Sequence, residues 1–203
     1  MSTQRASMKT QLILLLLALF ITHATAQEIH SSGEVHIDKH HFKKGLQISA
    51  SSTIKTGKDG KIRFNIKKDA FLVQANSEVI FKEESGVVKG FRLLNGAVLA
   101  VFGKGKHREI KTVTATAGIR GTAFYIEQSK NKTYFCNCYG KIDFAAADNS
   151  YKELLIATHH AARQIELKAD KYTHKKAGMH NHTDDELRIL EKMVGRSVPF
   201  DKK

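Results

Sequence analysis

The sequence predicts an all-β protein, either a sandwich or a solenoid-like stack of short strands, with one short C-terminal amphipathic helix. Apolar and polar residues alternate with a period of two along most of the chain, which is the pattern of half-buried strands. Glycines and polar turn residues interrupt this alternation about every eight to ten residues. Helical periodicity is missing from residue 28 to about residue 148. The strands follow no strict sequence period, so a regular solenoid is not singled out.

The first 26 residues have the composition of a secretory signal peptide. Arg5 and Lys9 precede an apolar run at residues 12–21, and Ala24-Thr25-Ala26 then offers a cleavage site of small residues. This run has about half of the roughly 20 apolar residues that a membrane-spanning helix needs, so an uncleaved anchor is the less favoured alternative. We therefore expect export and cleavage before Gln27.

The chain is strongly basic, with a formal net charge of +13 at pH 7. Removal of Arg5 and Lys9 with the signal peptide leaves +11. Outside the cytosol this charge could meet an anionic membrane surface or an acidic protein, although the lysines are scattered and also fit a plain solvated surface. The chain lacks Trp and aromatic-rich basic stretches, which argues against a stacking platform for single strands, so we expect no nucleic-acid partner.

The N-terminal part of the mature chain is predicted to consist of short strands joined by tight turns. Asp59-Gly60 is a strong turn signal. Ile62, Phe64 and Ile66 alternate with polar residues directly after it. The expected strands lie at residues 34–37, 45–48, 53–56, 61–67, 70–73, 78–82, 87–88, 91–94 and 97–102.

The stretch of residues 112–144 has the clearest β pattern. Residues 112–117 alternate between threonine and small apolar side chains. Gly118 and Gly121 then allow the backbone to turn or bulge. Strands are expected at residues 122–127 and 134–139 with a polar hairpin loop at 129–132, and a third strand begins at 142. No catalytic triad, metal motif or phosphate-binding loop is visible in it, and we expect no enzymatic activity.

The pattern changes after Asp148. Residues 151–155 and 158–167 are ambiguous, and we expect a last strand at the end of this region. Residues 170–181 are polar and rich in histidine, which favours a loop. Thr183 and Glu186 have the spacing of a capping box, and apolar residues share one face of a helix predicted at residues 184–194. We thus divide the mature chain into an all-β domain at 27–170 and a loop with a helix at 171–203.

An ordered series of motifs resembles the FecR domain, named for the iron-dicitrate transport regulator. The resemblance covers residues 45–144 and in its widest extent reaches Leu167. The most specific mark is Arg120-Gly121-Thr122-Ala123-Phe124 after a threonine-rich strand. The other motifs are Gly45, Ile54-Lys55-Thr56-Gly57, Gly60-Lys61-Ile62-Arg63-Phe64, Asn76-Ser77, Leu93-Leu94-Asn95-Gly96-Ala97-Val98 and Gly140-Lys141-Ile142.

This resemblance implies a periplasmic domain in a Gram-negative envelope. In full-length regulators of iron transport the domain receives a signal from an outer-membrane transporter, and a cytoplasmic segment controls a sigma factor. The sequence shows neither that segment nor a spanning helix nor a further receptor-contact domain, and Lys68-Asp69-Ala70 replaces a frequent Asp-Gly-Ser. We expect a free-standing, exported version that binds another envelope protein. Within it, Arg120, Gly121, Thr122 and Phe124 form the candidate partner-binding site, although Arg120 also fits a turn residue paired with a nearby carboxylate.

Cys136 and Cys138 are the two cysteines of the chain, and strand alternation places both side chains on one face. Their Cα atoms would be about 6.5–7 Å apart in a flat strand, so a direct disulfide would be strained. Three interpretations remain open. The thiols could be free and buried, could form a strained or intermolecular redox-active disulfide, or could bind a metal or haem.

Histidines supply further candidate ligands for zinc, iron or haem. Two adjacent pairs occur, at 40–41 and at 159–160, and a later group lies close to Asp184. The spacing matches no standard structural zinc pattern, and exposed loop histidines are the alternative. A metal- or haem-responsive envelope protein is therefore the alternative function. Its candidate ligands are Cys136, Cys138, His159, His160, His174, His180 and His182.

Overall fold

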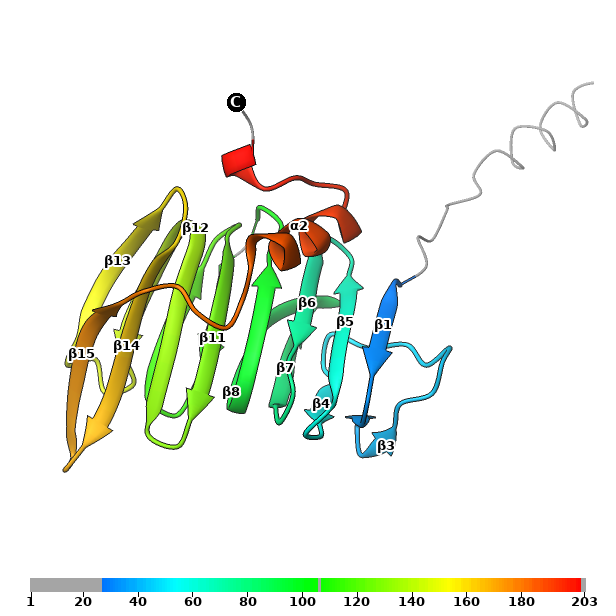
Figure 1. The fold of residues 1–203 in the computed structure, drawn as a ribbon, viewed down its shortest axis with the longest axis horizontal. Coiled ribbons are helices and arrows are strands. Elements are labelled where there is room, and N and C mark those ends of the chain that lie inside the picture. Colours follow the sequence, from blue (N-terminus) through cyan, green and yellow to red (C-terminus); the bar gives the residue numbers. More distant parts are fainter. Residues whose placement is uncertain (1–26, 106, 202–203) are drawn as a thin grey trace, which may run out of the picture.

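The computed structural model describes residues 27–105 and 107–201, and these residues form a mostly β protein with one α-helix near the C-terminus (Figure 1). This confirms the predicted β-rich fold with a short C-terminal helix, but neither a sandwich nor a solenoid-like stack. Among the described residues, no helix has the length and apolar content needed to cross a bilayer. The predicted signal peptide, residues 1–26, lies outside the described residues.

Two long strands, β8 (Val87–Val101) and β12 (Lys132–Ala146), each run through two sheets. The C-terminal half of β8 and the N-terminal half of β12 lie in sheet A. The order of sheet A is β1-β5-β6-β8-β11-β12-β14-β15, and it faces the viewer in Figure 1. Its other strands are β1 (Ile29–Ser32), β5 (Lys61–Ile66), β6 (Asp69–Val73), β11 (Ala123–Ser129), β14 (Ala161–Lys168) and β15 (Lys171–Ala177).

Sheet B contains the opposite halves of β8 and β12. Its order is β3-β2-β4-β7-β8-β9-β10-β12-β13, and only the β8–β9 pair is parallel. The other strands of this sheet are β2 (Val35–Ile37), β3 (His40–His41), β4 (Thr53–Thr56), β7 (Glu78–Glu84), β9 (Arg108–Lys111), β10 (Ala115–Ile119) and β13 (Lys152–Ala157).

The shared strands close a ring of hydrogen-bonded neighbours. Strand β8 pairs with β9, β9 with β10 and β10 with β12, and β12 returns through β11 to β8. These five strands form a closed barrel-like core, and the remaining strands extend the two sheets on either side. The closure removes free edges from the centre of the molecule, so among the described strands open edges remain at the ends of each sheet.

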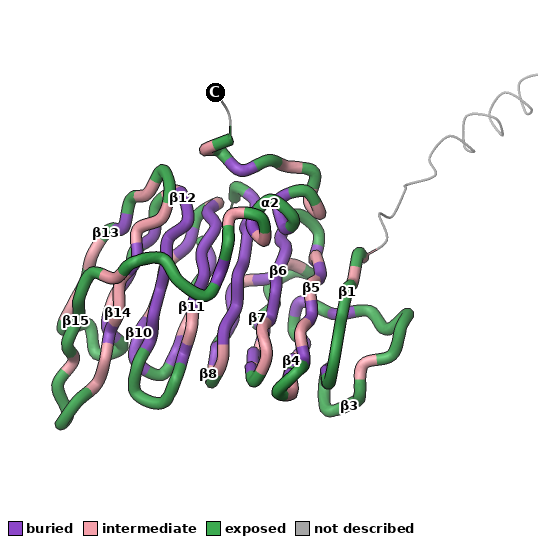
Figure 2. Tube along the Cα trace, viewed as in Figure 1, coloured by how far each residue is buried: buried purple, intermediate pink, exposed green. Residues whose placement is uncertain are grey.

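The inner core lies between the two sheets and is rich in phenylalanine. Phe64 and Phe71 of sheet A contact Phe81 of sheet B, with ring centroids 5.8 and 5.0 Å apart. A second apolar cluster, here called the outer cluster, lies on the other face of sheet A. It includes Leu72, Leu99, Val101, Tyr125, Cys136 and Cys138, together with Leu187, Leu190 and Val198 from the C-terminal segment. Figure 2 shows buried strand segments through the middle of the sheets.

Two predictions about the path of the chain are wrong. Residues 45–48 form no strand, and the side chain of Gln27 instead bonds the backbone of Ile48. The expected loop at 170–181 contains β15, which pairs with β14, so the predicted domain boundary at 170 falls inside a hairpin. Strand β15 is an edge strand with mostly exposed lysine, histidine and threonine side chains. Such a charged edge has no alternation of apolar and polar residues to reveal it.

The C-terminal helix, α2 (Asp184–Met193), begins as predicted with a capping box. Thr183 Oγ1 accepts a hydrogen bond from the Glu186 amide, and the Glu186 carboxylate accepts one from the Thr183 amide. The helix packs over β5, β6 and β8 and buries Leu187 and Leu190 in the outer cluster. It therefore covers part of the outer face of sheet A (Figure 1).

Replacing the capping hydroxyl should loosen this helix. We expect Thr183→Ala to lower the free energy of unfolding by about 1 kcal/mol, because an amide of the first turn loses its acceptor. Urea denaturation measures the difference. Thr183→Ser keeps the hydroxyl and should stay close to wild type, whereas equal stability of the Ala and Ser variants would contradict the role of the cap.

Candidate metal centre

Strand β12 brings both thiols to the outer face of sheet A. Cys136 and Cys138 point to the same side, as the alternation predicts, and both belong to the outer cluster. Each is fully buried and neither forms a disulfide. Phe135, which directly precedes Cys136, points to the opposite side and belongs to the inner core. The segment between β15 and α2 crosses this face (Figure 1), and through His182 it contacts Cys138.

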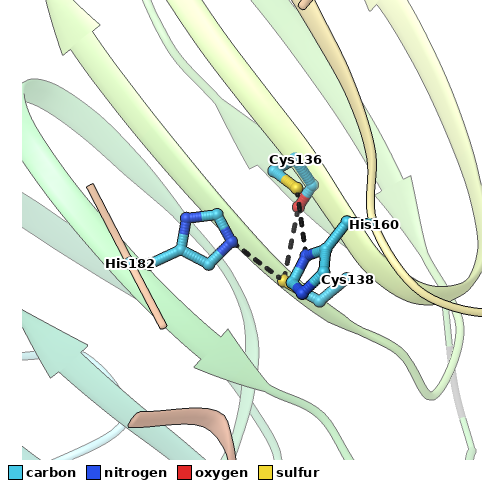
Figure 3. Close-up of side chains that lie close together, drawn as sticks. All are labelled: Cys136, Cys138, His160 and His182. Atoms are coloured by element: carbon cyan, nitrogen blue, oxygen red, sulfur yellow. Dashed lines mark hydrogen bonds between the residues drawn. The ribbon is translucent and has the colours of Figure 1, made fainter. Parts of the chain in front are cut away.

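Two histidines from distant parts of the chain meet these thiols (Figure 3). His160 lies in the turn between β13 and β14, and its Nδ1 is 3.4 Å from Cys136 Sγ. His182 lies just before α2, and its Nε2 is 3.6 Å from Cys138 Sγ. One ligand atom from each of the four residues lies within 4.8 Å of the others. The site is nearly closed to solvent, since His182 is 4% exposed and the His160 side chain 10%.

The second nitrogen of each imidazole is held by an oxygen acceptor. His160 Nε2 lies 2.8 Å from Asp184 Oδ1, at the first residue of α2. His182 Nδ1 lies 2.8 Å from the backbone oxygen of His180. With these nitrogens as donors, His160 Nδ1 and His182 Nε2 present lone pairs towards the thiols. The His182 ring also stacks on Tyr125, with centroids 4.6 Å apart, which fixes its plane.

The two sulfurs differ in their affinity for a proton. The hydrogen bond from Cys138 lowers the pKa of Cys136 below its usual value. Burial raises the pKa of Cys138, and the neighbouring Cys136 adds to this effect. Burial lowers the pKa of His160, but its hydrogen bonds to Cys136 and Asp184 outweigh this and raise it above its usual value. The cluster therefore favours a thiolate on Cys136.

Cys136, His160 and Asp184 also have the order of a nucleophile, a base and an orienting carboxylate. A catalytic cysteine must, however, meet a substrate, and Cys136 is fully buried beneath the C-terminal segment. The second thiol and second imidazole would have no function in such a triad. The four residues together are better described as a set of metal ligands than as a catalytic relay.

Three of the predicted ligands lie outside this cluster. His159 Nε2 contacts Asp184 Oδ2 at 3.0 Å, but the side chain is about half exposed. His174, on β15, stacks on Tyr151 with centroids 3.7 Å apart. His180 packs against Tyr134 at the same centroid distance and contributes its backbone oxygen rather than its ring. Sequence spacing alone could not separate these residues from His160 and His182.

The candidate partner-binding residues do not form a single surface. Thr122 and Phe124 are fully buried, and Phe124 lies in the inner core close to Phe91, Phe102 and Phe135, so neither side chain is exposed on the surface of this structure. Arg120 is exposed. Gly121 has φ +63°, and a Cβ there would lie 3.0 Å from the Lys104 backbone. The motif therefore serves the turn and the core, and only Arg120 faces solvent.

The sequence reasoning missed a buried ion pair, Asp69–Arg108, which joins β6 of sheet A to β9 of sheet B. Arg108 Nη2 lies 3.0 and 3.1 Å from the two carboxylate oxygens. Its Nε and Nη1 donate to the backbone oxygens of Val88 and Gly103. The only available signal was Lys68-Asp69-Ala70 as a departure from the family pattern, which did not identify a partner 39 residues away.

Comparison with protein-family models matches the FecR protein family at residues 52–142. The chain contains a FecR domain. The FecR match runs from β4 into β12 and thus includes the whole ring except the end of β12. It contains Cys136 and Cys138 but neither His160 nor His182, so the candidate metal centre joins the FecR domain to the segments that follow it.

Two solved structures are similar to this chain, both described as a candidate anti-sigma factor from Parabacteroides distasonis ATCC 8503. The first has a TM-score of 0.51 and 10% identity, covering 61% of this chain and 59% of that chain. The second has a TM-score of 0.44 and 10% identity, covering 74% and 60%. The chain thus spans about three fifths of each, and the first likeness concerns the fold alone. No curated protein gives a significant match.

Proposed function

We propose that the chain is a non-catalytic regulatory module that acts in the periplasm by binding another envelope protein. The observation that carries this proposal is the FecR domain at residues 52–142. The fold-level likeness to a candidate anti-sigma factor agrees with a regulatory rather than a catalytic role. The net charge of +13, which becomes +11 when Arg5 and Lys9 are removed, favours an acidic partner.

The edge strand β13 offers a binding surface for such a partner. Among the described strands it pairs only with β12, so one side of its backbone is open to a further strand. Leu154 and Ile156 are 54% and 59% exposed, whereas Leu155 between them is buried. An extended peptide that adds to an open edge gains backbone hydrogen bonds and places alternate side chains against such apolar residues. The edge strand of sheet A, β15, is by contrast rich in lysine, which discourages this pairing.

A photo-cross-linking residue at position 156 tests this surface in living cells. We expect one discrete adduct in the periplasmic fraction, and Leu154→Asp in the same chain should weaken it at least about tenfold, because a buried charge at the interface costs over 1.4 kcal/mol. As a matched control, the photo-cross-linking residue is placed at position 189 instead. Ile189 is 40% exposed on α2 and far from β13 in sequence.

The absence of an adduct at 156, or equal adducts at 156 and 189, would contradict the proposed surface.

Export is tested separately by the mass of the mature protein. We expect the purified periplasmic form to begin at Gln27, and a protein that begins at Met1 and stays with the cytosolic fraction would contradict a periplasmic role.

A further inference from the structure

We propose that Cys136, Cys138, His160 and His182 bind one Zn²⁺ ion in a tetrahedral site that fastens the C-terminal segment, residues 178–201, to β12. This inference does not depend on the regulatory role or on any envelope partner. It rests on the convergence of four ligand atoms, on the oxygen acceptors behind both imidazoles and on the burial of the site.

The spacing of the ligand atoms fits a tetrahedral zinc ion. With Zn–S of about 2.3 Å and Zn–N of about 2.1 Å, tetrahedral angles place a sulfur and a nitrogen about 3.6 Å apart. The sulfur–nitrogen distance is 3.4 Å between Cys136 and His160 and 3.6 Å between Cys138 and His182. These two pairs therefore already have the separation that a shared ion requires, and all four ligand atoms lie within 4.8 Å of one another.

The surroundings of the imidazoles are those of metal ligands. A metal-binding histidine usually donates its second N–H to a carboxylate or a backbone oxygen, which fixes the ring and strengthens the ligand. Both forms occur here, since His160 meets the Asp184 carboxylate and His182 meets the His180 backbone oxygen, each at 2.8 Å. A chance meeting of thiols and imidazoles would not require both outer nitrogens to be held in this way.

The charges also balance for a divalent ion. Both sulfurs bind the ion as thiolates, with any remaining thiol proton released to solvent, and two thiolates neutralise Zn²⁺, so the buried centre carries no net charge. This matters because an uncompensated charge in a site this closed would be strongly destabilising. Two sulfurs and two nitrogens in a tetrahedron favour zinc over the harder cations magnesium, calcium and manganese.

A disulfide between Cys136 and Cys138 is the main competing state. Residues two apart on one strand have Cα atoms about 6.6 Å apart, near the limit for a disulfide, and β12 would have to distort to close the bond. The two thiols instead each have an imidazole partner from another segment. Reduced thiols that share an ion require no change in the strand.

The site would join three segments that are distant in sequence. His160 follows Cys138 by 22 residues and His182 follows it by 44. His182 immediately precedes the helix cap, so an ion held there also fixes the start of α2 over the outer cluster. Zinc thus acts as a clamp on the C-terminal segment.

Metal titration of the mature protein, purified without a histidine tag and kept reduced, tests the proposal. We expect one zinc per chain, measured against a chromophoric chelator. Co²⁺ in place of zinc should give the intense visible bands of a tetrahedral ion and a thiolate charge-transfer band in the near ultraviolet. Cys138→Ser and His182→Ala should each weaken zinc binding at least about 100-fold, and Asp184→Asn about 10–100-fold.

The matched control is His174→Ala, which removes an exposed histidine away from the cluster and should leave zinc affinity unchanged. Circular dichroism of each variant shows whether it folds. The wild-type stoichiometry and cobalt spectrum need no variant, so they decide the proposal even if a ligand variant fails to fold. Less than half a zinc per chain, no thiolate band, an isolated protein that carries iron or copper instead, or a disulfide that persists in the periplasmic protein would each overturn it.

Discussion

Saturation with zinc is expected to raise the melting temperature of the mature, reduced protein by roughly 10 °C over the chelated form. An ion that binds only the folded chain stabilises it by about 4 kcal/mol when its concentration is a thousand times its Kd. For a chain of this size each kcal/mol corresponds to about 2–4 °C. The unfolded chain cannot supply the same site, because the ligands come from three segments.

The zinc-induced increase in melting temperature must depend on the four proposed ligand residues. His182→Ala should show almost no difference between zinc and chelator, whereas His174→Ala should keep the full increase. Hydrogen exchange adds a local readout, since amides in residues 178–190 should exchange faster after chelation while the inner core stays protected. A zinc-induced increase of the same size in His182→Ala would show that the ion binds elsewhere.

The substitution Asp69→Ala is expected to lower the free energy of unfolding by about 3–5 kcal/mol, because it leaves a buried guanidinium without its carboxylate. Arg108 and Asp69 are both buried, and Arg108 Cζ also lies 4.7 Å from the centre of the Phe102 ring. The Gly103 amide, which donates to Asp69 at 2.9 Å, would lose its acceptor as well. The change would therefore disrupt the contact between β6 and β9.

Burial raises the pKa of Asp69, although the Gly103 amide and Arg108 act in the opposite direction. The pair therefore adds little net stability as a unit, and the large cost arises when one partner is removed alone. In a double-mutant cycle, Asp69→Ala with Arg108→Ala should cost clearly less than the sum of the single changes.

Urea denaturation of the four proteins in the cycle measures this coupling. The control is the exposed pair of Lys89 and Glu84, whose side chains are 43% and 49% exposed. Lys89→Ala should cost less than about 1 kcal/mol. A cost below about 1 kcal/mol for Asp69→Ala would contradict the description of the buried network.

Local patterns in the sequence predicted the elements that depend on neighbouring residues. The alternation of Ile62, Phe64 and Ile66 identified a strand with one buried face, and all three side chains are buried. The capping box of Thr183 and Glu186 located the start of α2, because both of its hydrogen bonds lie within four residues. The FecR resemblance on ordered motifs is likewise confirmed at residues 52–142.

The site was predictable only in part. Alternation placed Cys136 and Cys138 on one face, but nothing local shows that a turn at His160 and a crossing segment at His182 lie above that face. These contacts span 24 and 44 residues and depend on the packing of β14, β15 and the C-terminal segment. In the sequence Asp184 is recognisable only as the start of the predicted helix. In the structure its carboxylate also contacts His159 and His160.

Zinc K-edge X-ray absorption on the purified mature protein reads the ligands of the proposed ion directly. We expect a four-coordinate ion with two sulfurs at about 2.3 Å and two imidazole nitrogens at about 2.0–2.1 Å. A first shell that contains only oxygen and nitrogen, or one with a single sulfur, would contradict it.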